Sequence, residues 1–149
     1  MTPDALAALH RAAFTTDRAW QAAEFSDLLS SAHTTLLHRP HGFALVRTIA
    51  DEAELLTLAV QPDHHRQGIA SALMHDWLSG TEATQVFLEV AADNVPARRL
   101  YERHGLTEHA RRSGYYARPG AAAVDAVLMR AALPPRHMRQ SPGKAGKTG

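Results

Sequence analysis

One glutamate stands in a segment whose other residues have the composition of a buried strand. The segment Gln85–Ala91 reads Gln-Val-Phe-Leu-Glu-Val-Ala, in which Glu89 is the one charged residue. Alternation along a strand places Glu89 on one face and its aliphatic neighbours on the other. A carboxylate taken out of water costs free energy unless it is paired or has a task, and removing a proton from a substrate is such a task. Glu89 is therefore a candidate general base, and the alternative is a glutamate at the strand end that reaches water or a nearby arginine such as Arg98 or Arg99.

A tyrosine in the next predicted helix supplies a complementary proton donor. The helix is expected over residues 95–104, because Asn94 is typical of a helix cap and Gly105 is typical of the residue that follows a helix. Tyr101 lies within it. A phenol with a pKa near 10 can protonate a departing thiolate, whose conjugate acid has a pKa of roughly 8.5. Tyr101 is therefore a candidate general acid, and the alternative is simple packing against the sheet.

A strand, a glycine turn and a helix follow one another directly over residues 55–71, and the turn carries Arg66, Gln67 and Gly68. Gly68 permits close approach of the backbone. The unpaired amides of residues 66–71, together with the helix dipole, form a site for an anion such as a diphosphate, and Arg66 adds positive charge. The alternative is an ordinary strand-to-helix turn, and a short glycine motif does not by itself decide between the two.

Hydrophobic spacing predicts the elements that must position these groups. Helices are expected at about 3–13, 20–31, 69–80 and 95–104. Strands are expected at 34–38, 43–50, 54–60, 85–91, 106–116 and 124–131. The predicted order is ααβββαβαββ, and it includes one parallel strand–helix–strand crossover. We therefore expect an α/β fold with a mixed sheet and helices on both faces.

Composition excludes several classes of protein. With 149 residues, of which 45% are hydrophobic and 21% are charged, the chain has the size of one domain with a core. The absence of cysteine excludes disulfides, a thiolate nucleophile and cysteine-ligated metals, and the 10 histidines show no helical metal-ligand spacing, so no metal is expected. We also expect a cytoplasmic protein with no membrane partner. The chain has no apolar run long enough to cross a bilayer, and its N-terminal segment has an acid, Asp4, where a signal peptide has a basic start.

Charge is distributed unevenly between the two ends of the chain. Residues 133–149 are rich in proline, glycine and basic residues and contain no acid. Such a segment cannot bury enough apolar surface to order itself. We therefore expect a domain at 1–132 and a flexible basic tail at 133–149. Because these basic residues do not lie on a folded face, no direct nucleic-acid binding is expected, and the pattern indicates no oligomeric state.

The glycine turn resembles the acetyl-CoA loop of the GNAT acetyltransferase superfamily. The family pattern is Arg/Gln-x-x-Gly-x-Gly/Ala, and this chain has His65 at the first position and Ala70 at the last. The resemblance implies that acetyl-CoA is bound as a co-substrate and that the strand before the loop pairs with its pantetheine arm. The cofactor-binding residues implied are Leu58, Ala59, Val60, Arg66, Gln67, Gly68, Ile69, Ala70 and Ser71.

The later strand and helix resemble the RimI branch of that superfamily, the ribosomal-protein-alanine N-acetyltransferases. Segments 88–94 and 97–106 carry this resemblance, which covers about residues 9–133 and is strongest over 55–116. The chain departs from the family at Ser113, which replaces an arginine, and at the alanine-rich stretch 118–124, which we expect to be a loop. The resemblance implies a role for Glu89 as general base, Tyr101 as general acid, Asn94 at the cofactor, and Tyr115 and Tyr116 at the acceptor.

The resemblance implies that an acetyl group is transferred from acetyl-CoA to a primary amine, preferably the N-terminal α-amine of a protein such as a ribosomal protein. Direct attack in a ternary complex is expected, because the chain has no cysteine and no evident Ser-His-Asp arrangement. An α-amine has a pKa near 7.7–8.0 and a lysine near 10.4, so neutralising a lysine at pH 7 costs roughly 3.5 kcal/mol more. Two alternatives remain open: an acetyltransferase for small-molecule amines, and an acetyl-CoA-binding module without turnover.

Overall fold

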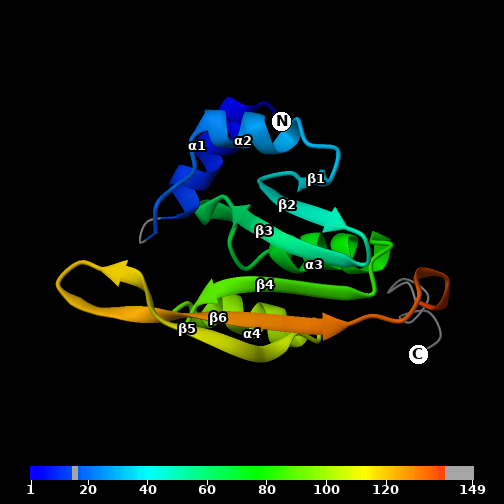
Figure 1. The fold of residues 1–149 in the computed structure, drawn as a ribbon. Coiled ribbons are helices and arrows are strands. Elements are labelled where there is room, and N and C mark those ends of the chain that lie inside the picture. Colours follow the sequence, from blue (N-terminus) through cyan, green and yellow to red (C-terminus); the bar gives the residue numbers. More distant parts are fainter. Residues whose placement is uncertain (15–16, 140–149) are drawn as a thin grey trace.

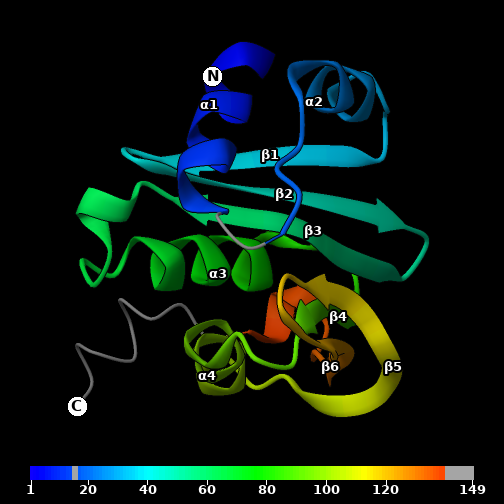
Figure 2. The same ribbon diagram turned by 90° about the vertical axis from the view of Figure 1, so that its left-hand side faces the viewer.

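A six-stranded mixed sheet with helices on both faces forms the centre of the molecule (Figures 1 and 2). The computed structural model describes residues 1–14 and 17–139. The helices are α1 (Pro3–Ala13), α2 (Ala22–Leu29), α3 (Ile69–Gly80) and α4 (Val95–Arg103). The strands are β1 (Thr34–Arg39), β2 (Gly42–Ile49), β3 (Glu52–Val60), β4 (Gln85–Ala91), β5 (Thr107–Arg118) and β6 (Ala121–Ala132). The predicted order of elements and the mixed sheet are confirmed.

Polar caps set where the helices begin. The hydroxyl of Thr2 accepts a hydrogen bond from the Ala5 amide (3.1 Å), and this starts α1. The side chain of Asn94 accepts one from the Ala97 amide (3.3 Å) and starts α4 in the same way. The second helix begins later than the predicted residue 20, because the amide of Gln21 donates to the carboxylate of Glu24 (3.1 Å) and makes Gln21 the cap.

The two faces of the sheet carry two separate apolar clusters. Along β2, Phe43 and Leu45 pack with residues of α1 and α2, whereas Ala44 and Val46 pack with residues of α3 and α4. Figure 2 shows the two helix pairs on opposite sides of the sheet. The period-two alternation of the strands thus determines which helices cover which face.

The sheet is divided between its third and fourth strands. The strand order is β1-β2-β3-β4-β6-β5, and β3 and β4 are parallel. They pair only from Glu52 with Gln85 to Glu54 with Phe87. Beyond that point β3 stays paired with β2 and β4 stays paired with β6, so the two strands diverge (Figure 1). The final residues of β3 therefore have an open main-chain edge.

The last two strands form a longer hairpin than predicted. The predicted loop at 118–124 is wrong: Arg118 already pairs with Ala121, and Tyr116 pairs with Val124. Pro119 and Gly120, the latter with φ at +70°, are the only residues between the strands. Alanine is a poor strand former, and pairing with β5 overrides that preference.

The first residues of the predicted tail contact the domain. The Leu133 amide donates to the carbonyl of Thr84 (2.7 Å). The guanidinium of Arg139 donates to the carbonyls of Leu78 (3.1 Å) and Ala83 (2.7 Å), and also to that of Thr81. The prediction of a flexible tail considered only apolar burial. It did not take into account the carbonyls near the end of α3, which need hydrogen-bond donors. Residues 140–149 lie outside the described residues, and the boundary at 132 stays a prediction.

None of the helices in residues 1–14 and 17–139 combines the length and the apolar composition that crossing a membrane would require.

Candidate active site

Glu89 lies on the face of β4 that α3 and α4 leave uncovered, because the alternate residues of that strand belong to the core beneath those helices. Its side chain is 25% exposed, and Oε1 accepts a hydrogen bond from Nη2 of Arg112 at 2.6 Å. The alternative of an ion pair with an arginine is thus confirmed, but the partner is Arg112 rather than Arg98 or Arg99, because α4 is on the opposite face of the sheet. Among the residues that the structure describes, none donates a hydrogen bond to Oε2. One carboxylate oxygen is thus held, and the other is free to accept a proton.

Tyr101 lies on α4 and is only 8% exposed. Burial, with a smaller contribution from nearby Tyr116, raises the pKa of Tyr101 to about 12. The phenol is therefore fully protonated at neutral pH and can act as a proton donor but not as a base.

Two adjacent tyrosines on β5 have different surroundings. The ring centroids of Tyr115 and Tyr116 are 5.0 Å apart, and the rings are perpendicular. Tyr115 is 54% exposed and lies 5.1 Å from the guanidinium carbon of Arg112. Tyr116 is half-buried, and its pKa is raised by burial and then by the charge of Glu89. Tyr116 is thus close enough to Glu89 for that charge to affect its pKa, and close enough to Tyr101 to affect the pKa of Tyr101. Tyr115, in contrast, faces solvent.

The glycine turn leaves the start of α3 without a side-chain cap. Gly68 is the cap residue and has a left-handed φ of +78°, and Arg66 also has a positive φ of +66°. Because glycine has no side chain to satisfy the first amides of α3, these donors remain available to an anion. The hydroxyl of Ser71, in that first turn, lies 2.9 Å from Nε2 of His104 and so links α3 to the end of α4.

The turn is fixed by neighbours on both sides. Nε2 of His65 donates to the carbonyl of Val60 (3.0 Å), the last residue of the open strand edge. The ring of His64 stacks on that of His41 with centroids 3.6 Å apart. A Cβ added at Gly42 would lie 2.8 Å from Cγ2 of Ile69, so glycine is needed there for the start of α3 to approach β2. These contacts give His64 and His65 loop-packing roles.

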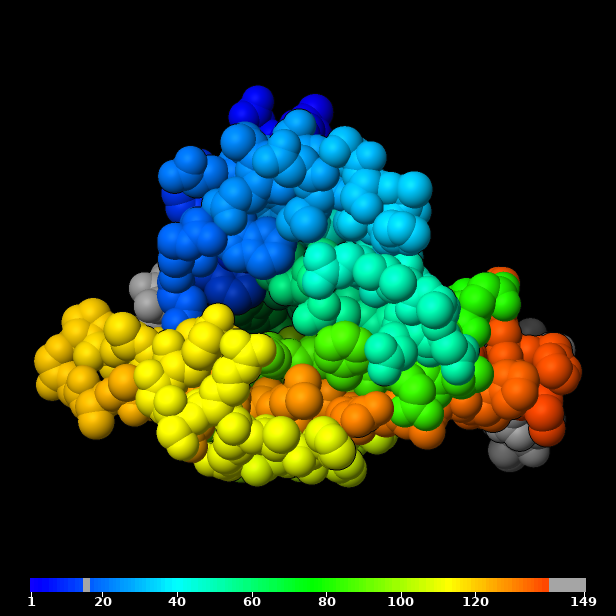
Figure 3. Space-filling view, viewed as in Figure 1, coloured from blue at the N-terminus to red at the C-terminus, as the bar shows by residue number. Residues whose placement is uncertain are grey.

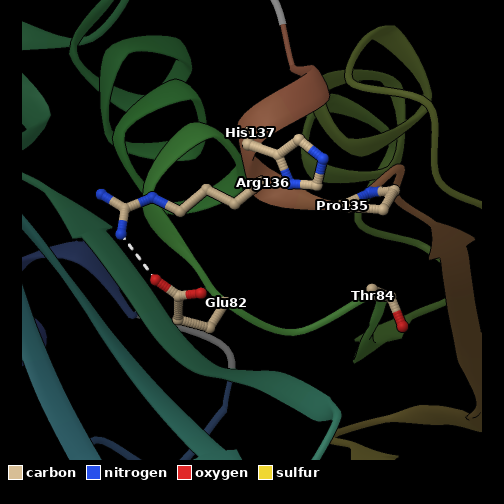
Figure 4. Close-up of a pocket in the computed structure, with 5 residues that line it drawn as sticks. All are labelled: Glu82, Thr84, Pro135, Arg136 and His137. Atoms are coloured by element: carbon tan, nitrogen blue, oxygen red, sulfur yellow. Dashed lines mark hydrogen bonds and ion pairs between the residues drawn. The ribbon is translucent and has the colours of Figure 1, made fainter.

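Two open hollows lie elsewhere on the surface. One, of about 520 Å³, is lined in part by Arg47, Glu54 and Phe87. It shares a face of the sheet with Glu89, because Phe87 and Glu89 are two residues apart on β4. The other, of about 510 Å³, is shown in Figure 4 and is lined by Glu82, Thr84, Pro135, Arg136 and His137. It contains none of the predicted site residues, and an ion pair of 2.6 Å between Arg136 and Glu82 spans it.

Comparison with known proteins identifies the family. Residues 4–106 match the model of the Acetyltransferase (GNAT) family. The chain belongs to the GNAT family. This GNAT protein is 39% identical over 95 residues to the ribosomal protein bS18-alanine N-acetyltransferase of Escherichia coli strain K12, and the match covers 62% of each chain. It is 32% identical over 126 residues to the N-alpha-acetyltransferase RimI of Mycobacterium tuberculosis, covering 78% of each. The predicted resemblance to the RimI branch is confirmed.

Solved structures agree with this assignment. The crystal structure of the ribosomal-protein-S18-alanine N-acetyltransferase from Escherichia coli has a TM-score of 0.76 at 28% identity, covering 88% of this chain and 86% of that one. Ard1 from Thermoplasma volcanium has a TM-score of 0.74 at 26% identity, covering 90% and 95%. The GNAT protein spans 62% of the length of the Escherichia coli relative that it matches in sequence.

Two arginines have carboxylate partners that the sequence did not indicate. The ion pair of Glu89 with Arg112 and the burial of Arg118, whose side chain is 9% exposed, both depend on β5 lying beside β6 at the end of the sheet. No local signal pairs either arginine with its carboxylate, because each carboxylate is far away in the sequence.

Proposed function

We propose that this GNAT protein transfers the acetyl group of acetyl-CoA to the N-terminal α-amine of a protein. The observation that supports this most is the divergence of β3 and β4 after Glu54 and Phe87. The divergence leaves β3 with an open main-chain edge, and the facing strand β4 carries the candidate base. The bS18-alanine N-acetyltransferase of Escherichia coli and the N-alpha-acetyltransferase RimI of Mycobacterium tuberculosis support a protein N-terminus as the acceptor, and the former favours a ribosomal protein.

Acetyl-CoA binds along the divergence in this proposal. Leu58, Ala59 and Val60 offer their main chain to the pantetheine arm as an added strand. The diphosphate lies on the amides of 66–71, with the Arg66 side chain nearby and Asn94 contacting the cofactor from the start of α4. Because His65 bonds to the carbonyl of Val60, the strand edge and the diphosphate loop are held in one geometry.

The acceptor amine approaches from the face that carries Glu89. Its ammonium group gives a proton to Oε2, the oxygen that Arg112 does not bind. The nitrogen then bonds to the thioester carbon, whose oxygen is polarised by the amide of Val60, and the carbon–sulfur bond breaks. Tyr101 protonates the departing sulfur. The nitrogen loses two protons in all: Glu89 passes the first to solvent, and the second restores Tyr101.

The acceptor class can be tested with purified protein and acetyl-CoA. Peptides that begin with alanine, serine or methionine are compared with spermidine and an aminoglycoside, with CoA release measured and the modified nitrogen located by mass spectrometry. We expect turnover with peptides and modification at the α-nitrogen. Turnover only with small amines would contradict the acceptor, and acetyl-CoA binding without any CoA release would contradict the enzyme.

The glycine turn provides a prediction on cofactor binding. Gly68→Ala places a Cβ at a left-handed φ, which costs about 1 kcal/mol of folding stability. No neighbouring atom lies within 4 Å of that Cβ, so it occupies open space at the turn whose amides are proposed to hold the diphosphate. We expect calorimetry to show acetyl-CoA binding weakened by about tenfold, or 1.4 kcal/mol.

Gly80→Ala is the matched control, because Gly80 is the last residue of the same helix and its Cβ also meets open space. Alanine there should leave binding unchanged and stability equal or higher. Equal binding by the two variants would contradict the placement of the diphosphate.

A further inference from the structure

The side chain of Arg118 is largely covered although it belongs to a surface hairpin. Its side chain is 9% exposed, and each of its guanidinium nitrogens has a partner. Nε and Nη2 donate to the two carboxylate oxygens of Asp93 at 2.8 and 2.9 Å, and Nη1 donates to Asp17 at 2.8 Å and to the carbonyl of Ala117 at 3.0 Å. A largely covered guanidinium is tolerated here because it has two carboxylate partners. We call Arg118, Asp17 and Asp93 the arginine clasp.

The arginine clasp joins three segments that are distant in the sequence. Asp17 lies in the connection between α1 and α2, Asp93 lies between β4 and α4, and Arg118 ends β5. Figure 3 shows the N-terminal segment (blue) meeting the β5–β6 hairpin (yellow) beside a recess in this face of the molecule. Without the clasp, nothing among the described ion pairs ties the α1–α2 connection to the hairpin.

The clasp lies against the acceptor side of the site. The guanidinium carbon of Arg118 is 5.7 Å from the ring centroid of Tyr116, the tyrosine whose pKa responds to the charge of Glu89. None of the hydrogen bonds of Arg118 reaches the diphosphate loop at 66–71. The cap that starts α4, between Asn94 and Ala97, also forms without Arg118.

We propose that Arg118 is a positioning residue that holds the acceptor side of the site in its binding geometry and so determines affinity for the acceptor peptide. The inference rests on the proposed function and adds to it a residue that holds the acceptor side of the site in place. Loss of the clasp lets the α1–α2 connection and Tyr116 move independently of Glu89, while the cofactor loop keeps its contacts. Loss of an interaction that serves substrate binding alone raises KM and leaves kcat unchanged.

The test compares Arg118→Met with Arg39→Met. Arg39 matches the bidentate part of the clasp, since its Nε and Nη2 donate to both carboxylate oxygens of Asp76 at 2.9 Å, although its side chain is 45% exposed. It forms no hydrogen bond with the predicted site residues. For Arg118→Met we expect KM for an alanine-initiated peptide to rise by about tenfold, with kcat and KM for acetyl-CoA changed by no more than about twofold. Arg39→Met should leave all three constants near wild type.

Asp17→Asn tests the arginine clasp through the partner of Arg118 in the α1–α2 connection. It should raise KM for the peptide, and the double variant Asp17→Asn/Arg118→Met should be no worse than Arg118→Met, because both remove one connection. If the methionine variant does not fold, Arg118→Lys takes its place in the comparison of the two KM values, because lysine keeps a cation beside both carboxylates.

The outcomes separate the two proposals. Wild-type protein without turnover on any peptide overturns the proposed function, and the acceptor role of the clasp with it. Wild-type turnover combined with an unchanged peptide KM in Arg118→Met, or with equal rises in both KM values, overturns the clasp alone.

Discussion

Replacement of Glu89 by glutamine is expected to lower kcat for an acceptor peptide by about 100-fold to 10,000-fold, the range in which general acid–base groups contribute. Glutamine keeps the shape of the side chain and can still accept from Arg112, but it cannot take a proton from the substrate. Acetyl-CoA binding should stay near wild type. Initial rates of CoA release, together with calorimetry of acetyl-CoA binding, measure both quantities.

Glu54→Gln is the matched control for this variant. Glu54 is on β3, its side chain is 26% exposed, and it accepts from Arg47 at 2.8 Å, whereas Glu89 is 25% exposed and accepts from Arg112 at 2.6 Å. A general effect of losing a half-buried ion pair would appear equally in both variants. Similar kcat values for the two variants would therefore contradict the role of Glu89 as base.

Tyr101→Phe tests the proton donor in the same assay. The change removes one hydroxyl and preserves the packing of a ring in the core beneath α4. We expect kcat to fall by about 100-fold. Because the pKa of Tyr101 is raised to about 12, the wild-type rate should not decline between pH 7 and pH 9 through deprotonation of this group. Loss of turnover in Glu89→Gln and in Tyr101→Phe, with acetyl-CoA binding retained, would exclude a module that only binds acetyl-CoA.

The parts of the site that could be predicted from sequence have local causes. Asn94 caps α4 through the amide of Ala97, and Gly68 takes the left-handed conformation that ends the turn before α3. Alternation along β4 likewise puts Glu89 opposite the core residues of the same strand. In each case the interacting groups are within a few residues of one another, so the residue types alone indicate the geometry.

The parts that could not be predicted depend on strand order and register. Arg112 reaches Glu89 only because β6 lies between β4 and β5 and pairs Glu89 with Leu128 and Arg112 with Ala126. Arg118 finds Asp17 only because the hairpin extends to Pro119, which the alanine-rich sequence does not indicate. Long-range pairing of this kind leaves no periodic pattern in one sequence. These ion pairs beside the site could therefore be identified only from the three-dimensional structure.

Acid is expected to destabilise the protein through one buried histidine. His10 on α1 is 1% exposed and stacks on Phe14, with ring centroids 4.0 Å apart. Its Nδ1 accepts from the Trp20 amide at 3.1 Å, so the neutral ring carries its proton on Nε2 and donates to the hydroxyl of Thr57 at 3.0 Å. His10 thus connects α1, the segment before α2, and β3, and it does so only as the neutral ring.

The sign of the effect follows from proton binding. Burial lowers the pKa of His10 from 6.5 to about 4 in the folded protein. Below pH 6.5 the unfolded chain therefore takes up a proton that the folded protein does not, and the free energy of unfolding falls until the pH approaches 4. At 1.36 kcal/mol per pH unit, this amounts to about 2 kcal/mol between pH 7 and pH 5, and about 3 kcal/mol in total.

Urea unfolding of wild type and His10→Phe at pH 7 and pH 5 measures this contribution. Phenylalanine keeps the stacked ring but leaves the Trp20 amide and the Thr57 hydroxyl without their partner, so the variant should be less stable at pH 7 by about 1–3 kcal/mol. Between the two pH values it should lose about 2 kcal/mol less than wild type. His104, whose pKa is also lowered by burial, is present in both proteins and cancels in the difference. Equal pH dependence in the two proteins would mean that folding does not lower the pKa of His10. As a control, His38→Gln, at an exposed histidine of β1, should leave the wild-type dependence in place.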